Sequence, residues 1–163
     1  MTRRILGIDP SLVACGWGVI DVTGTKMVHI AHGVIRPPAK EPLPSRLTYL
    51  FNDIVDVITS YDPIEVGIEE IFMNNNAMSA LKLGQARSAC ILAATTQGLR
   101  VGEYAARLVK KSVVGTGAAD KAQVAHMMNV LLPGSKVKAG DAADALAIAI
   151  THANTRAQYF KAS

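Results

Sequence analysis

Closely spaced cysteines and long apolar runs are both missing from this sequence. Its two cysteines, Cys15 and Cys90, lie far apart without metal-ligand spacing, which argues against a zinc motif or a disulfide framework. Nothing indicates secretion, so we interpret both as reduced core thiols. No apolar run approaches the roughly 18 residues that span a bilayer. The opening stretch "MTRRILGIDP" has too short an apolar run to predict a signal peptide. We therefore expect a cytoplasmic protein without membrane contact.

Internal repeats and low-complexity segments are also absent. Charged residues make up only 18% of the sequence, against 50% apolar residues. For a chain of 163 residues, this composition predicts one globular domain over residues 1–163 with a substantial core. The net charge is +4 and the pI is about 9.2. This modest basic excess favours a polyanionic partner.

What the sequence does contain is an ordered series of strand and helix patterns. Three segments of β-branched or alternating character come first, with a tight turn at "TGT", and predict an antiparallel meander. Helical spacing then predicts a helix from Ser45, as N-cap, to about Tyr61. The later segments are a strand "EVGIEEIF", a helix over 78–97, a strand "LRVGEYAA", a basic segment "LVKKSVVGTGAADK" that is partly loop, and helices over 120–132 and 141–156. This order predicts an α/β fold with a mixed five-stranded sheet and helices on both faces.

The last predicted helix carries two carboxylates where it begins. Asp141 and Asp144 share a helix face that continues to Ile148, and the rest of the helix is apolar nearly all round. Both acids are therefore expected to point toward the sheet. Two interpretations stay open on this pattern alone. The acids are either caps, with Asp141 as N-cap and Asp144 at N3, or ligands.

Two further acids stand at the ends of apolar strands. Asp9 follows Gly7, and Glu69 follows Gly67, with each pair on one face of its strand. Glycine weakens a strand, so its presence indicates close packing of another element, and the alanine-rich helix after Asp144 is suitable. A buried carboxylate is costly unless it is paired or binds a metal. Together with the aspartate pair, these acids predict a cluster of four carboxylates.

Such a cluster, without histidine or cysteine, suits hard cations, chiefly Mg²⁺ or Mn²⁺. Two such ions about 3.5–4 Å apart stabilise both the attacking and the leaving oxygen of an in-line phosphodiester cleavage. The four acids contribute −4 to the net charge of +4, so the remaining chain carries +8. That surplus is suited to holding phosphates. The acids therefore predict a two-metal phosphodiester site.

Four blocks of the sequence, covering almost the whole chain, resemble the RuvC-type Holliday-junction resolvases. The blocks are "GIDP" with "GWG", "IEEIFMNNNAMSALKLGQAR", "EYAARLVKKSVVGTGAADKAQV" and "DAADALAIAITH". The first also resembles sugar kinases and actin-like ATPases, whereas the second and fourth together are specific. The resemblance implies a ribonuclease H-like fold and a homodimeric, metal-dependent endonuclease that nicks opposed strands of a four-way DNA junction symmetrically, in recombination and repair. It also implies a branch-migration helicase complex as a partner.

The resemblance carries roles over to individual positions. The catalytic and metal-binding carboxylates of the family match Asp9, Glu69, Asp141 and Asp144. Lys110 and Lys121 match basic residues that contact DNA and assist near the scissile phosphate. Phe72 matches an aromatic residue that disturbs base stacking at the junction, and Asn76 is assigned a DNA contact. Glu70, next to Glu69, faces the other side of its strand and is not one of the catalytic acids.

Some of these positions have simpler interpretations. Lys110 is otherwise a solvated loop charge, and Phe72 is otherwise a core residue. Lys82 and Arg87, on the helix after the polar "MNNNA" tip, either contact backbone phosphates or are surface charges, and we favour the contact. Ser11 stands where most of the family has glycine, so a turn with φ > 0 there would be strained.

Alternative functions and surfaces stay open as well. The chain could be a ribonuclease H-like nuclease for another branched or hybrid substrate, or a DNA-binding module without catalysis. Four acids without metal would repel phosphate, which argues against the module. An actin-like or sugar-kinase ATPase needs two such domains, for which the chain is too short. Met78, Leu81 and Leu83 belong either to a dimer face or to the core.

Overall fold

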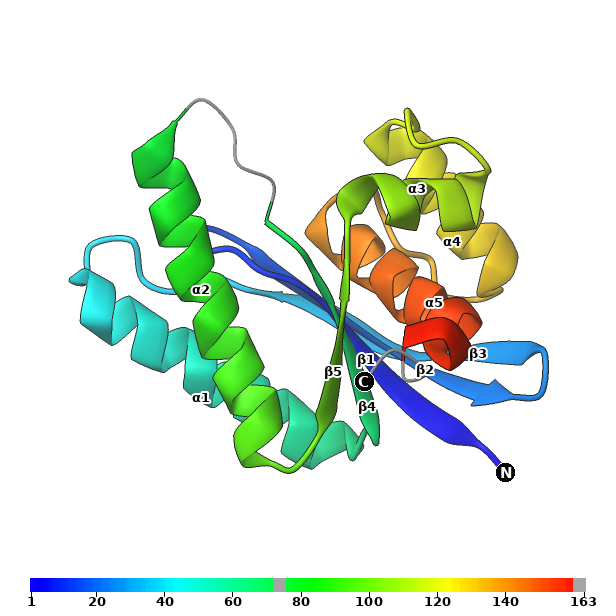
Figure 1. Ribbon diagram of the computed structural model, residues 1–163, viewed down its shortest axis with the longest axis horizontal. Coiled ribbons are helices and arrows are strands. Elements are labelled where there is room, and N and C mark those ends of the chain that lie inside the picture. The colour runs from blue at the N-terminus through cyan, green and yellow to red at the C-terminus, as the bar shows by residue number, and fades with distance from the viewer. Residues whose placement is uncertain (72–75, 160–163) are drawn as a thin grey trace.

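Five strands and five helices make up the part of the chain that the computed structural model describes, which is residues 1–71 and 76–159, with side chains up to residue 155 (Figure 1). In chain order they are β1 (Arg3–Asp9), β2 (Cys15–Thr23), β3 (Lys26–Ile35), α1 (Leu43–Tyr61), β4 (Glu65–Glu69), α2 (Ala77–Thr96), β5 (Arg100–Tyr104), α3 (Ala106–Val114), α4 (Lys121–Leu131) and α5 (Asp141–Tyr159). The predicted order of elements is confirmed.

The sheet is mixed, with its strands in the order β3-β2-β1-β4-β5. β1, β2 and β3 form the predicted antiparallel meander, whereas β4 runs parallel to β1 and β5 runs parallel to β4. Parallel neighbours end at the same edge of a sheet. The ends of β1 and β4, where Asp9 and Glu69 lie, are therefore side by side.

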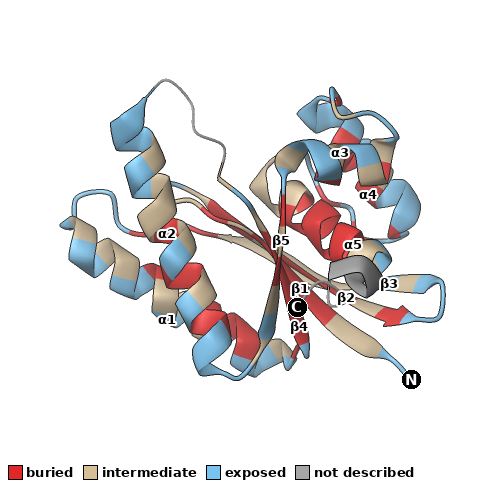
Figure 2. Cartoon of the chain, viewed as in Figure 1, coloured by how far each residue is buried: buried red, intermediate tan, exposed pale blue. Residues whose placement is uncertain are grey.

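Helices cover both faces of the sheet, as predicted. Figure 1 shows α1 and α2 over one face and α3, α4 and α5 over the other. Alternation along β1 supplies both cores, since Leu6 and Ile8 join the cluster with α1 and α2, while Ile5 joins the cluster with α5. Figure 2 shows α5 buried along most of its described length. Within residues 1–71 and 76–159, no helix combines the length and apolarity needed to cross a bilayer.

Helix α1 begins earlier than its sequence pattern predicts. The prediction of Ser45 as N-cap is wrong, because the helix starts at Leu43 with Pro42 in the N-cap position and no side-chain cap. Pro44 lies in the first turn, where a missing N–H costs nothing and the fixed φ already suits a helix. The proline-rich segment therefore ends inside α1 instead of before it. The helices α2, α4 and α5 begin and end within three residues of the predicted positions, whereas α3 lies in the basic segment that was expected to be partly loop and was not predicted as a helix.

A row of four glycines crosses the sheet beneath α5. The glycines, which pair in turn on β2, β1, β4 and β5, are Gly18, Gly7, Gly67 and Gly102. A Cβ at Gly7 would collide with the carbonyl oxygen of Ala145, and a Cβ at nearby Gly16 would collide with that of Asp141. The helix backbone thus lies directly on the strand backbones. This confirms the close approach that Gly7 and Gly67 predict, and it fixes where α5 begins.

Buried polar contacts hold the later part of α5. His152, which is fully buried, shares hydrogen bonds with the Tyr104 hydroxyl (2.8 Å from Nδ1) and with Glu65 Oε2 (3.0 Å from Nε2). Arg3 pairs with the same Glu65 oxygen at 3.3 Å. Buried polar groups are costly unless they are satisfied in this way. The network therefore fixes α5 against the starts of β1 and β4.

Candidate active site

Asp9 and Glu69 end the adjacent parallel strands β1 and β4. Side chains alternate along a strand, so each acid faces the same side as the glycine two residues before it. That side is covered by α5, because Gly7 contacts Ala145 and Gly67 contacts His152 and Ile148. The two strand acids therefore point toward α5, as the sequence predicts.

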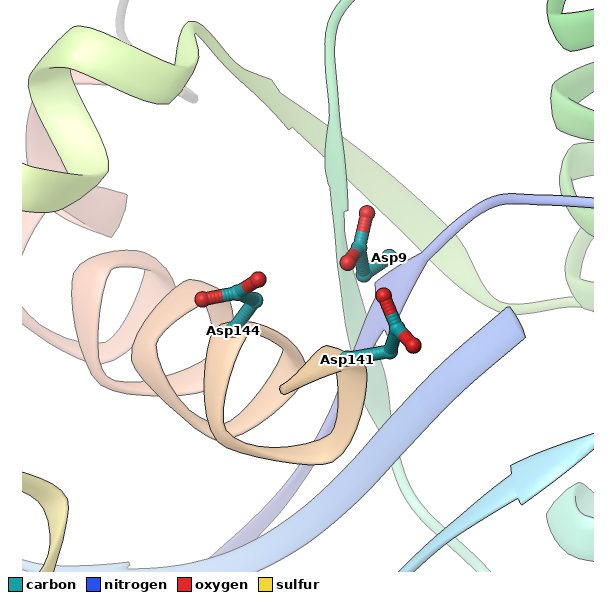
Figure 3. Close-up of side chains that lie close together, drawn as sticks. All are labelled: Asp9, Asp141 and Asp144. Atoms are coloured by element: carbon teal, nitrogen blue, oxygen red, sulfur yellow. The ribbon is translucent and has the colours of Figure 1, made fainter. Parts of the chain in front are cut away.

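The first turn of α5 brings Asp141 and Asp144 to the same place. Figure 3 shows both carboxylates near that of Asp9, and one carboxylate oxygen from each of the three lies within 4.8 Å of the others. The capping interpretation of Asp141 is wrong: α5 begins at Asp141, and Asp144 N donates to the carbonyl of Gly140 (3.1 Å), which is the N-cap residue. The two acids therefore lie inside the helix, on the face that meets the strand ends.

Glu69 completes the cluster from the side of β4. It lines a hollow of about 330 Å³ together with Asp9 and Asp144. It is not one of the three acids whose oxygens lie within 4.8 Å of one another. Among the neighbouring charges, that of Glu69 nevertheless has the largest effect on the pKa of Asp9, which it raises. The predicted group of four is thus a triad of aspartates with a glutamate beside it.

Burial and mutual repulsion make Asp9, Glu69 and Asp144 difficult to ionise. Burial, reinforced by the charge of Glu69, raises the pKa of Asp9 to about 8. Burial also raises the pKa of Glu69 and that of Asp144 above their usual ranges. The cluster is therefore short of positive charge, and hard oxygen donors of this kind fit a divalent cation such as Mg²⁺ or Mn²⁺.

Two lysines border the same hollow, and both are positions to which the resemblance assigns a role. Lys110 comes from α3, and Lys121 is the first residue of α4. A capping box between Asp120 and Gln123 begins α4 and so positions Lys121. Lys121 Nζ lies 3.8 Å from Asp144 Oδ2, and its charge lowers the pKa of Asp144 against the larger effect of burial. The hollow is therefore lined by both cations and carboxylates.

The other residues assigned to DNA contact lie in different surroundings. Phe72 falls outside the described residues. Asn76 is the N-cap of α2, and its side chain accepts a hydrogen bond from Ser79 N at 3.1 Å. Lys82 is exposed on α2. Arg87 turns inward, where Nε donates to the backbone carbonyl of Glu69 at 2.9 Å. Contact of these residues with DNA stays a prediction.

Ser11 fits its turn without strain. Among described residues other than glycine, positive φ occurs only at Asp62 and Lys136. The Ser11 hydroxyl accepts hydrogen bonds from Val13 N (3.0 Å) and Ala14 N (3.2 Å). Serine therefore stabilises the loop after Asp9, where a left-handed turn would have strained it.

Two features of the site were missed in the sequence. The capping box that begins α4 is readable as Asp120 with Gln123 three residues later, a known helix-start signal. The second is an ion pair between Arg87 and Glu103, which joins α2 to β5. No local pattern pairs a helix residue with a strand residue in this way, so no sequence signal could have indicated it.

Comparisons with known proteins give a family and a fold for the chain. The family model described as crossover junction endodeoxyribonuclease RuvC matches residues 5–152. A protein of that name from Maricaulis maris is 63% identical and covers 96% of this chain and 93% of its own, and one from Caulobacter vibrioides is 56% identical and covers 96% and 92%. Among solved structures, Thermus thermophilus RuvC in complex with a Holliday junction is 31% identical, with a TM-score of 0.84 over 98% of this chain and 94% of that one.

Proposed function

This chain belongs to the RuvC family of crossover junction endodeoxyribonucleases, and from that premise we propose that Asp9, Glu69, Asp141 and Asp144 are its catalytic, metal-binding residues. The protein is a Holliday-junction resolvase with the expected ribonuclease H-like fold. The ATPase and the DNA-binding module without catalysis are set aside with this finding. The observation that carries the site assignment is the approach of three aspartate oxygens to within 4.8 Å of one another.

The acids would hold two Mg²⁺ ions, with Mn²⁺ as a substitute. Such a pair stabilises charge on the attacking and leaving oxygens of a phosphodiester. Asp9, whose carboxylate oxygen approaches those of Asp141 and Asp144 and which lines the hollow with Glu69, would be one of the residues that hold these cations. Its proton would be lost when the cations bind.

The chain's cations would hold and orient the scissile strand. Lys121, beside Asp144, would contact the scissile phosphate, and Lys110 would hold it from the opposite helix. Lys82 and Asn76, on the exposed start of α2, would contact the junction's backbone farther away. Phe72 would disturb base stacking at the crossover, a role that rests on the resemblance alone.

Metal-dependent nicking of a synthetic four-way junction tests this function. We expect paired nicks on two opposed strands with Mg²⁺ or Mn²⁺ and no nicks in EDTA, because the acids cannot hold substrate phosphate without the cations. A linear duplex of the same sequence is the control and should stay intact. Equal cleavage of duplex and junction would indicate a nuclease for another substrate, and cleavage in EDTA would contradict the metal assignment.

A homodimer is the assembly we propose, through the layer formed by α1 and α2. This layer carries an apolar groove of about 950 Å³ lined in part by Leu47, Phe51, Leu81 and Leu92. Met78 and Leu81 are 63% and 56% exposed, which favours the dimer face over the core for both. The active site lies on the other face of the sheet, so association there would leave the acids open to DNA. A branch-migration helicase partner and a cytoplasmic location stay predictions.

We expect Leu81→Glu to weaken dimerisation by roughly a hundredfold or more, because burying an unpaired charge costs about 3 kcal/mol. Analytical ultracentrifugation over a concentration series measures the effect. Val130→Glu is the matched control, since Val130 on α4 is 54% exposed but lies away from the groove. A dimer that Leu81→Glu leaves intact, or that Val130→Glu disrupts equally, would contradict this interface.

A further inference from the structure

Arg87 contacts β4, the strand that ends at Glu69, from the face of the sheet that α5 does not cover. It belongs to α2, and its side chain is only 16% exposed. Nε donates to the backbone carbonyl oxygen of Glu69 at 2.9 Å, and Nη2 pairs with the Glu103 carboxylate on β5. A surface cation that bound a DNA phosphate would instead present its guanidinium to solvent.

The held carbonyl lies at the end of β4, where the pairing with β1 stops at Ile68 and the pairing with β5 stops at Glu69 itself. β4 ends at Glu69, and the next backbone bond of the chain runs from Glu70 N to the carbonyl of Tyr104 (2.9 Å). The peptide plane between Glu69 and Glu70 sets the direction of the Glu69 side chain. Arg87 and Tyr104 therefore fix that plane from its two sides.

The effect of Arg87 is exerted through the backbone and not through charge at the carboxylate. Its Nε contacts the main-chain oxygen of Glu69 from the face of the sheet opposite to the one that the carboxylate faces. Its planar fork can serve the Glu69 carbonyl and the Glu103 carboxylate at once, which a lysine cannot do. Glu103, 42% exposed, in turn holds the fork in this orientation.

We propose that Arg87, held by Glu103, is a positioning residue that fixes the backbone of Glu69 and thereby the geometry of the metal-binding cluster. The inference rests on the proposed role of Glu69 as a metal ligand. It replaces a phosphate contact as the main role of Arg87. It also places a determinant of metal affinity in the helix layer on the far side of the sheet.

Binding of Mn²⁺ to the full-length protein without DNA, followed by electron paramagnetic resonance, tests the proposal directly. We expect Arg87→Gln to weaken binding by about 10- to 100-fold, the usual effect of removing a group that orients a ligand. Arg87→Lys should fall close to Arg87→Gln, because charge without the fork cannot hold both partners. Glu103→Gln should give a smaller loss in the same direction, and it guards against misfolding because its side chain is partly exposed.

Salt dependence of junction binding in Ca²⁺ separates positioning from DNA contact. Lys82→Ala, the matched control on the same helix, should reduce the slope of log affinity against log salt by about one phosphate contact. Arg87→Gln should leave that slope unchanged. A reduced slope with unchanged Mn²⁺ affinity would overturn the proposal, as would full rescue by Arg87→Lys. If the wild type binds no Mn²⁺, both the proposed metal site and the positioning role of Arg87 are wrong. If Arg87→Gln binds Mn²⁺ as tightly as the wild type does, only the positioning role of Arg87 is wrong.

Discussion

Glu69→Gln and Asp144→Asn each lower junction cleavage by several orders of magnitude while junction binding persists. Both variants keep the size and shape of the side chain but remove one negative charge from a cluster whose purpose is to hold cations. Without that charge, metal occupancy falls, and repulsion of the DNA phosphate falls with it. Single-turnover cleavage in saturating Mg²⁺ measures the first effect, and junction affinity in Ca²⁺ measures the second.

Glu70→Gln is the matched control for Glu69→Gln. It makes the same chemical change one residue later, at an exposed position outside the hollow that the acids line. We expect it to cleave as wild type does. Cleavage by Glu69→Gln or Asp144→Asn within about tenfold of wild type, a difference near 1.4 kcal/mol in the barrier, would contradict the assignment of that residue. Asp141→Asn should also lose activity, which a helix cap would not, since asparagine caps as well as aspartate.

Asp9→Asn stabilises the metal-free protein, and the gain grows with pH. Burial raises the pKa of the Asp9 carboxyl to about 8 in the folded protein, whereas an unfolded aspartate titrates near pH 4. Below about pH 4, Asp9 is protonated in both the folded and the unfolded wild type and does not destabilise the fold. As the pH rises from 4 toward 8, the unfolded state loses this proton more readily, so the free energy of unfolding of the wild type falls. Asparagine has no proton to lose. The difference between the variants should level off above pH 8.

Thermal unfolding in EDTA at pH 5, 7 and 9 measures this gain. With allowance for solvent screening, we expect Asp9→Asn to gain on the order of 2–4 kcal/mol at pH 9, a rise in Tm of roughly 5–15 °C. In saturating Mg²⁺ the wild type should have the higher Tm of the two, because only the wild type gains the binding energy of the metal. Equal stability at all three pH values would show that Asp9 is not held in a repulsive, buried cluster.

The acids of the site could be predicted because each leaves a local trace in the sequence. Asp9 and Glu69 interrupt apolar strands two residues after a glycine, and the aspartate pair begins a helix that is otherwise apolar. Such residues are costly in a core, so a cluster is the simplest physical explanation. The strand and helix periods that placed these acids also fixed the mixed sheet and its two helix layers.

The remaining features depend on contacts between distant parts of the chain. Arg87 has the sequence context of a surface cation, and only its approach to Glu69 and Glu103 reveals another role. His152 belongs to no motif, yet it is fully buried against Tyr104 and Glu65. Ser45 failed as a cap for a local reason, since two prolines shift the helix start and a single cap residue is weak evidence beside them.

The glycine contacts under α5 have a consequence for how freely this sequence can vary. At Gly7 and Gly16, helix carbonyls lie on strand backbone with no side chain between them, and one of those carbonyls belongs to Asp141 itself. The spacing between the helix acids and the strand acids is therefore set by main-chain contact and not by the volume of any core residue. Apolar residues elsewhere in either core can drift in size, one substitution at a time, without moving the carboxylates apart. A protein engineer who redesigned both cores would need to keep these small positions, together with the polar contacts of His152 and Arg87, to preserve the geometry of the acids.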